Sequence, residues 1–214
     1  MEKTIQILIY IHAAFGGIAL LTGFISMVAK KGKKIHKKFG LFFFYSMMLS
    51  GIIAMVIAVL PKHENPFLFA IGIFSLYFVL TGKRALNFKL ANPDLRADKW
   101  ISKIMILTGL LMIILPIVLT KSINIVLVVF AIIGIIFSVK DLVLFKNPEQ
   151  LRKGWLKLHL GKMLGGYISA TTAFVVVNQF LPSYYAWFIP GIIGGLIITY
   201  WSRKINKKTA AKKG

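Results

Sequence analysis

Lysine and arginine gather in four short regions of this chain, and these regions alternate with long apolar stretches. Each region holds six of the 27 basic residues: 30–38, 83–103, 140–162 and the segment from 203 onward. The other three, Lys3, Lys62 and Lys121, fall at the N-terminus or in the gaps between regions. This alternation is the positive-inside pattern of multi-pass membrane proteins, whose basic loops stay on the cytoplasmic side. It predicts an N-terminus outside the membrane and a C-terminus inside.

Seven apolar stretches are long enough to cross a hydrocarbon core of roughly 30 Å as helices. They cover residues 5–28, 41–60, 67–82, 101–120, 123–139, 162–181 and 185–202. Backbone polar groups in lipid need internal partners, which favours helices over open strands. The predicted fold is therefore all-α: one domain, 1–214, forms a polytopic bundle of seven transmembrane helices. Residues 203–214 form a basic cytoplasmic tail.

The charged residues argue against several classes of function. The net charge of +21 flanks apolar stretches, so membrane lipids with anionic headgroups at the cytoplasmic face are the expected partners, and nucleic acid is not. The absence of cysteine excludes disulfides, thiolate metal sites and cysteine nucleophiles. All six acidic residues lie outside the predicted spans, and no lysine or arginine lies in mid-span. This distribution argues against proton-relay carboxylates, a retinal Schiff base and a voltage sensor.

Two predicted spans carry a stripe of small residues beside a histidine, His12 in the first span and His159 at the start of the sixth. Such stripes let helices pack closely, and we expect Gly165 and Gly166 at helix contacts. The alternative is that the stripes leave room for a small or hydrophobic ligand. The residues predicted to bind it are His12, Gly16, Asn178, Met163 and Gly166.

Histidine also ligates metal ions and haem iron, which suggests a second kind of site. His36 and His159 both lie at the predicted inner boundary, and Asp98 completes a candidate metal site with them. Haem or a divalent metal is the cofactor that this alternative implies, and the sequence does not choose between them. His12 lies in the outer half of its span, so it cannot share one metal ion with His159. No H-x-x-x-H or H-E-x-x-H motif occurs.

Four segments stand out together: Ile11-His12 with Gly16-Gly17, 35–40 (IHKKFG), 81–85 (TGKRA) and 159–178. They resemble a family of bacterial multi-pass membrane proteins of unknown function, and the last segment resembles members from Bacteroidota. Many relatives carry a His-rich segment before the fourth span, where this chain has Ala97-Asp98-Lys99-Trp100. The resemblance covers residues 1–90 and 155–180. The resemblance gives weight to the histidines and implies no activity. The missing His-rich segment argues against a shared His-based inner site, unless Asp98 takes the place of a histidine.

The sequence leaves three functions open. The first is a binding or carrier protein for a hydrophobic or small ligand, held between the first, second and sixth spans. The second is a haem- or metal-binding protein in redox or cofactor handling. The third is a subunit or scaffold that packs against a copy of itself or against another membrane protein. Nothing in the motifs favours an enzyme, and the predicted location is the cytoplasmic (inner) membrane of a bacterium.

Overall fold

The computed structural model describes residues 2–210, and the side chains of all of these except 183 and 207–210. This part of the chain consists of helices and their connections, with no strand among the described residues. The helices are α1 (Glu2–Val28), α2 (Lys34–Ile57), α3 (Pro66–Arg84), the 3-10 helix η1 (Ala85–Lys89), α4 (Arg96–Thr120), α5 (Ile125–Leu144), α6 (Pro148–Val177) and α7 (Ser183–Ala210). Each of the seven α-helices is long and apolar enough to cross a membrane. The prediction of an all-α fold with seven helices able to span a membrane is therefore confirmed.

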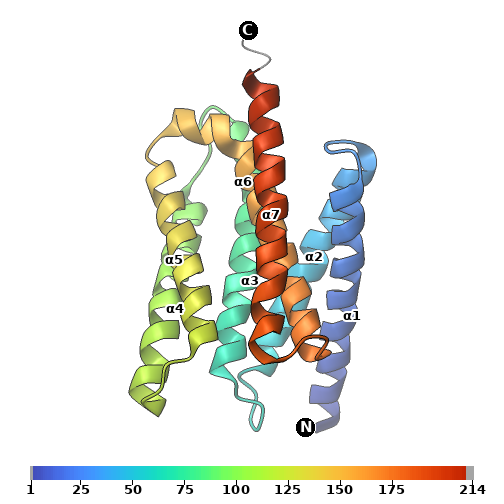
Figure 1. Ribbon diagram of the computed structural model, residues 1–214, viewed down its shortest axis with the longest axis vertical. Helices are drawn as coiled ribbons and strands as arrows, with labels where there is room; N and C mark the ends of the chain where they lie inside the picture. Colours follow the sequence, from blue (N-terminus) through green and yellow to red (C-terminus); the bar gives the residue numbers. More distant parts are fainter. Residues whose placement is uncertain (1, 211–214) are drawn as a thin grey trace.

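Successive helices run antiparallel, so the connections alternate between two ends of the bundle (Figure 1). The α1–α2, α3–α4 and α5–α6 connections and the end of α7 lie together, and they hold the four basic regions. We call this the basic end. Gly32 turns the chain between α1 and α2 with a φ of 79°, a left-handed conformation that glycine adopts without strain.

Several helices extend past the apolar stretches at the basic end. Helix α5 ends at Leu144 rather than at 139, and α6 begins at Pro148 rather than at 162. The first turns of α6 cross the basic end before the helix descends through the bundle (Figure 1). Asn147 caps this helix, because its Oδ1 accepts a 3.1 Å bond from the backbone N–H of Gln150. Pro148 follows in the first turn of the helix, where its missing N–H leaves no helical hydrogen bond unmade.

Helices α3 and α6 form the centre of the bundle and approach closely at glycines. A Cβ at Gly165 would lie 2.5 Å from Phe78, and one at Gly166 would lie 2.4 Å from Val79. The prediction that both glycines are at helix contacts is confirmed, and the partner is α3. The α1–α2 hairpin packs on one side of this pair, α4–α5 pack on the other, and α7 packs on α6 (Figure 1).

A leucine at Gly166 should destabilise the protein, because Val79 is fully buried and cannot move aside. We expect overpacking to cost about 1–3 kcal/mol, seen as a lower melting temperature in detergent. The matched control is Gly161→Leu on the same helix, where a Cβ meets nothing within 4 Å. Equal melting temperatures for the two variants would contradict the close α3–α6 contact.

Candidate functional site

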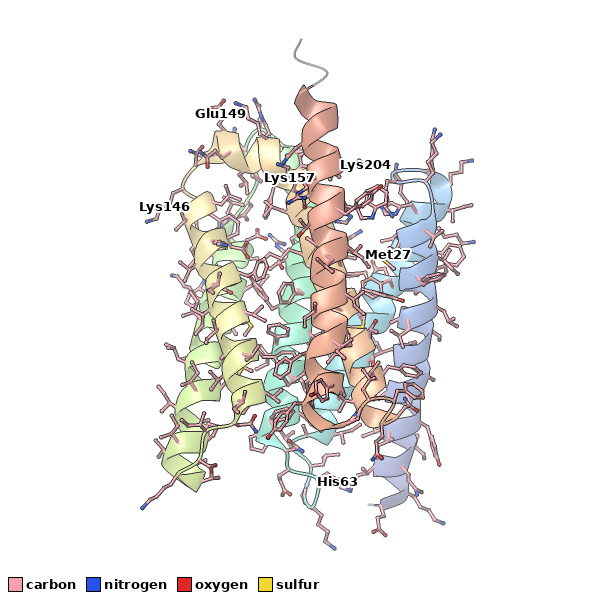
Figure 2. The ribbon with its side chains drawn as sticks, in the orientation of Figure 1. Met27, His63, Lys146, Glu149, Lys157 and Lys204 are labelled. Atoms are coloured by element: carbon pink, nitrogen blue, oxygen red, sulfur yellow. The ribbon has the colours of Figure 1, made fainter. Side chains whose placement is uncertain are left out.

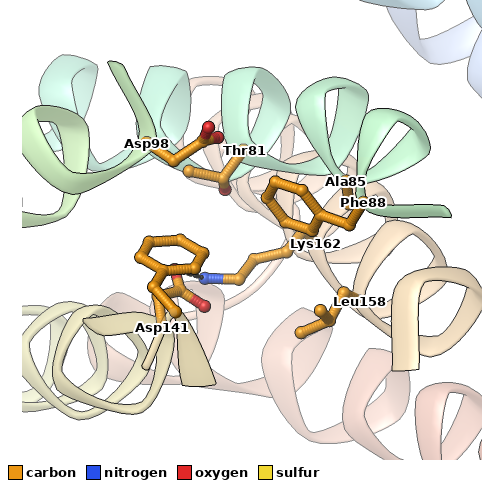
Figure 3. A pocket seen from close by; sticks show the side chains of 8 residues that line it. Thr81, Ala85, Phe88, Asp98, Asp141, Leu158 and Lys162 are labelled. Carbon is orange, nitrogen blue, oxygen red and sulfur yellow. Dashed lines mark hydrogen bonds and ion pairs between the residues drawn. The ribbon is translucent and has the colours of Figure 1, made fainter. Parts of the chain in front are cut away.

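A buried ion pair joins α5 to α6 near the basic end. Lys162 donates from Nζ to Oδ2 of Asp141 at 2.5 Å, and Tyr77 of α3 donates its hydroxyl to the same oxygen at 2.6 Å. Lys162 also donates to the Tyr77 hydroxyl. All three side chains are buried, with exposed fractions of 3–5%. Figure 3 shows the ammonium directed at the carboxylate. Charges this far from water persist only when they are paired and hydrogen-bonded.

Aromatic rings surround the Lys162 ammonium. Its Nζ lies 4.3 Å from the ring centroid of Tyr77, 5.2 Å from that of Phe137 and 5.6 Å from that of Phe78. Electron-rich ring faces attract a cation, and more strongly where water is excluded. The rings therefore help the carboxylate to keep the charge of Lys162 inside the bundle.

A second ion pair lies beside the first. Arg84 of α3 makes a bidentate contact with Asp98 of α4, from Nε to Oδ1 and from Nη2 to Oδ2, both at 2.7 Å. Asp98 is fully buried, whereas Arg84 is partly exposed at the basic end. Bidentate pairs of this kind are among the strongest charge-assisted hydrogen bonds. Asp98 is thus engaged by an arginine, and it is not paired with a histidine as a metal site would require.

Both ion pairs border one small cavity of about 10 Å³. Its lining residues are Thr81, Ala85, Phe88, Asp98, Asp141, Phe145, Leu158 and Lys162 (Figure 3). This is about the volume that one water molecule needs, and four of the lining side chains are polar. The cavity is too small for an organic ligand. The two ion pairs therefore hold α3, α4, α5 and α6 together and do not form a substrate pocket.

These charges correct a prediction made from the sequence. Asp98, Asp141 and Lys162 are buried within helices that are long and apolar enough to span a membrane, although the two acids lie outside the predicted apolar stretches. The exclusion of buried carboxylates no longer holds. An available signal was the apolar run from Leu142 to Phe145, which continues the helix beyond Asp141. Each acid has a basic partner on another helix, and the sequence does not reveal this pairing.

Two histidines join α1 to α2 by matching contacts. The Nδ1 of His12 lies 2.9 Å from the carbonyl oxygen of Ser50, whose hydroxyl donates to the carbonyl of His12 at 3.0 Å. The Nδ1 of His36 lies 2.9 Å from the carbonyl oxygen of Ser26, whose hydroxyl donates to the carbonyl of His36 at 3.1 Å. The sequence contains the signal, because both helices carry H-x-x-F-G with a serine ten residues after the glycine.

His159 is held in the same manner by α3. Its Nδ1 lies 2.8 Å from the carbonyl oxygen of Gly82. A carbonyl oxygen only accepts, so Nδ1 carries the proton in His12, His36 and His159, and Nε2 is the nitrogen left to bind a ligand. His36 and His159 are close enough to interact electrostatically. No group of three or more His, Asp or Glu residues within the described part of the chain is arranged to hold a metal ion.

Four of the five residues predicted to bind a ligand lie at helix contacts, and the fifth, Asn178, is exposed at the end of α6. Gly16 faces the Ser50 hydroxyl, Gly166 faces Val79, and Met163 fills the space beside Gly82. Asn178 donates from Nδ2 to the carbonyl of Phe174 in its own helix, at 2.8 Å. No cavity described above or below is lined by His12, Gly16, Asn178, Met163 or Gly166. Their role in ligand binding stays a prediction.

The larger space lies between α6, α7 and the end of α1, as an apolar groove of about 320 Å³. Its lining residues are Met27, Leu164, Tyr167, Ile168, Thr171, Val175, Leu181, Ile189, Pro190, Ile193, Gly194 and Ile197. Only Tyr167 and Thr171 carry a polar group, and Thr171 donates to the carbonyl of Tyr167 at 2.9 Å. The groove therefore suits an apolar molecule. The sequence predicts a site between the first, second and sixth spans, whereas α7 rather than α2 borders this groove.

Comparisons with models of protein families, with curated proteins and with solved structures found no match to this chain. The resemblance to a family of bacterial membrane proteins therefore stays a prediction, and the sites rest on their geometry.

Removal of one partner from the Asp141–Lys162 pair should be costly, because it leaves the other charge buried alone. We expect Asp141→Asn or Lys162→Met to lower the free energy of unfolding in detergent by about 3–5 kcal/mol. The double variant should lose clearly less than the sum of the two, since no unpaired charge remains.

The matched control is Lys153→Met, which breaks the exposed pair between Lys153 and Glu149. Its cost should stay below about 1 kcal/mol. Strictly additive losses for Asp141→Asn and Lys162→Met would show that the two side chains do not form a coupled pair.

Proposed function

We propose that the protein resides in a bacterial cytoplasmic membrane, with its basic end in the cytoplasm and its N-terminus outside. The support is the gathering of the four basic regions at one end of the bundle, which is the positive-inside arrangement. At the opposite end, the described lysines are only Lys3, Lys62 and Lys121. Anionic headgroups of the inner leaflet are the partners that this arrangement implies.

Within that membrane, we propose that the protein binds an apolar ligand in the groove between α6, α7 and the end of α1. The observation that carries this proposal is the groove itself, which is apolar and, at about 320 Å³, within the range of small-molecule sites. Gly194 of α7 has no side chain, so α7 lies close against Ile168 of α6 at this position, and both residues line the groove.

Photolabelling with a diazirine fatty acid tests this function in purified protein. We expect the label on 164–175 of α6 and on 189–197 of α7, located by mass spectrometry. Ile193→Trp should reduce labelling several-fold, because Ile193 lines the groove and an indole would fill it.

The matched control is Ile192→Trp, which changes an exposed neighbour that does not line the groove. Its labelling should equal that of the unmodified protein. Equal labelling of the Ile193→Trp and Ile192→Trp variants would contradict an apolar site in the groove.

A second candidate function is haem or metal binding at His36 and His159. The observation that favours it is the bond from each Nδ1 to a backbone carbonyl, which leaves Nε2 as the ligating nitrogen. Histidines that ligate haem iron or zinc are oriented in the same way, by a hydrogen bond from the other ring nitrogen. Since the two rings come from α2 and α6, a bound group would join the α1–α2 hairpin to the centre of the bundle.

An absorbance spectrum after addition of haemin tests the second candidate. We expect the unmodified protein to show a Soret band. Each of the single variants His36→Ala and His159→Ala should abolish it. The control is His63→Ala, which alters an exposed histidine at the opposite end and should leave the band unchanged. A protein without a Soret band, or a band that survives both substitutions, would rule out haem at these residues.

A further inference from the structure

Two lysines and a tryptophan lie at the basic end of the groove. Met27 and Ile197 are the groove residues nearest this end, and Lys31 and Trp201 lie four residues beyond them in the sequence. The Lys31 Nζ lies 5.0 Å from the Trp201 ring centroid, which joins the end of α1 to α7. The Lys204 Nζ lies 4.9 Å from the same centroid. Figure 2 shows Met27 and Lys204 in the space between α7 and α1.

Neither ammonium group forms an ion pair with a carboxylate among the described side chains. Lys31 donates instead to the carbonyl oxygen of Met27 and, at 3.5 Å, to that of Ser26. Partial burial lowers the pKa of Lys31 below its ordinary value, so its charge is held at a cost. Two cations therefore share one indole ring without a counter-ion.

The chain itself offers no spare acidic side chain for them. Of its six acidic residues, Glu2 and Glu64 lie at the opposite end. The four near the basic end are all in ion pairs: Asp94 with Arg96, Asp98 with Arg84, Asp141 with Lys162, and Glu149 with Lys153. The anion that would neutralise Lys31 and Lys204 must come from another molecule.

The groove indicates the rest of that molecule. It runs along α6 from Leu164 to Val175, which is about 16 Å at 1.5 Å per residue and matches an extended alkyl chain. Basic pockets between transmembrane helices bind lipid headgroups at the cytoplasmic side. We propose that the ligand of the groove is an anionic phospholipid, whose acyl chain occupies the groove and whose phosphate headgroup binds Lys31, Lys204 and Trp201. This inference rests on the proposed function, since it names the ligand of the same groove.

Native mass spectrometry of the full chain in detergent tests the headgroup. The probes are phosphatidylglycerol and phosphatidylcholine with identical acyl chains, supplied together at equal concentration. We expect the protein to retain phosphatidylglycerol preferentially. The double variant Lys31→Gln/Lys204→Gln should weaken phosphatidylglycerol binding by roughly tenfold or more and lose the preference.

The matched control is Lys33→Gln/Arg203→Gln, which removes two exposed charges from the same connection and the same helix. It should keep both the binding and the preference. Because Lys204 is exposed, Lys204→Gln alone provides the test if the double variant does not fold. Equal retention of the two lipids, or equal losses in the double variant and its control, would overturn the headgroup site.

The groove variant separates this inference from the proposed function. If Ile193→Trp blocks fatty-acid labelling while the lysine variants bind both lipids normally, the groove binds apolar ligands and the headgroup inference fails. A second outcome is that the lysine variants lose phosphatidylglycerol, whereas the Ile193→Trp variant still binds it fully and is still fully labelled by the fatty acid. In that case the groove holds no acyl chain, and both proposals fail as stated.

Discussion

The backbones of α3 and α6 approach so closely that their contact surface has no room for side chains at Gly165 and Gly166. Helices in lipid gain little from hydrophobic burial against each other, so close packing and polar contacts must hold them together. The contact between α3 and α6 provides both the close packing and the polar contacts. One face of α6 presents His159 to the Gly82 carbonyl and Lys162 to Tyr77 and Asp141. The other α-helices attach around this centre, and its remaining face forms the floor of the groove.

The scarcity of acidic residues gives the lysines different roles. Lys162 lies inside the bundle because Asp141 and three aromatic rings compensate its charge there. Lys31 lies at the edge without a carboxylate, and its nearest partners are backbone carbonyls and an indole ring. Because the chain has 27 basic and only six acidic residues, most basic side chains near the basic end must lack a carboxylate partner. This excess of positive charge is what the proposed binding of anionic lipids rests on.

Hydropathy predicts the number of helices, and the small-residue stripe predicts the contacts at Gly165 and Gly166; the structure confirms both. The orientation in the membrane, which the charges predict, stays a prediction. The helix ends are predicted poorly, because an apolar stretch stops at the first charge whereas helical hydrogen bonding continues past it. Asp141 is buried because of Lys162 and Tyr77, which are 21 and 64 residues away in the sequence. Local patterns carry no information on such pairs. The contacts of His12 and His36 are a separate case. The repeated H-x-x-F-G motif is visible in the sequence, but only the structure shows that each histidine contacts a serine carbonyl of the neighbouring helix.

Two tryptophans of α7 contact other parts of the bundle, one on each side of the groove. Towards the opposite end, Trp187 packs against Phe67 and Phe130, with ring centroids 5.2 and 6.0 Å apart. Towards the basic end, Trp201 contacts Lys31. The groove residues of α7, from Ile189 to Ile197, all lie between these two tryptophans. A tryptophan contact therefore lies beyond each end of the groove, and the one towards the basic end contains a charge without a carboxylate partner. A headgroup bound at Lys31 would engage the same side chain that joins the α1–α2 connection to α7, so its binding would bear directly on how α7 is held beside the groove.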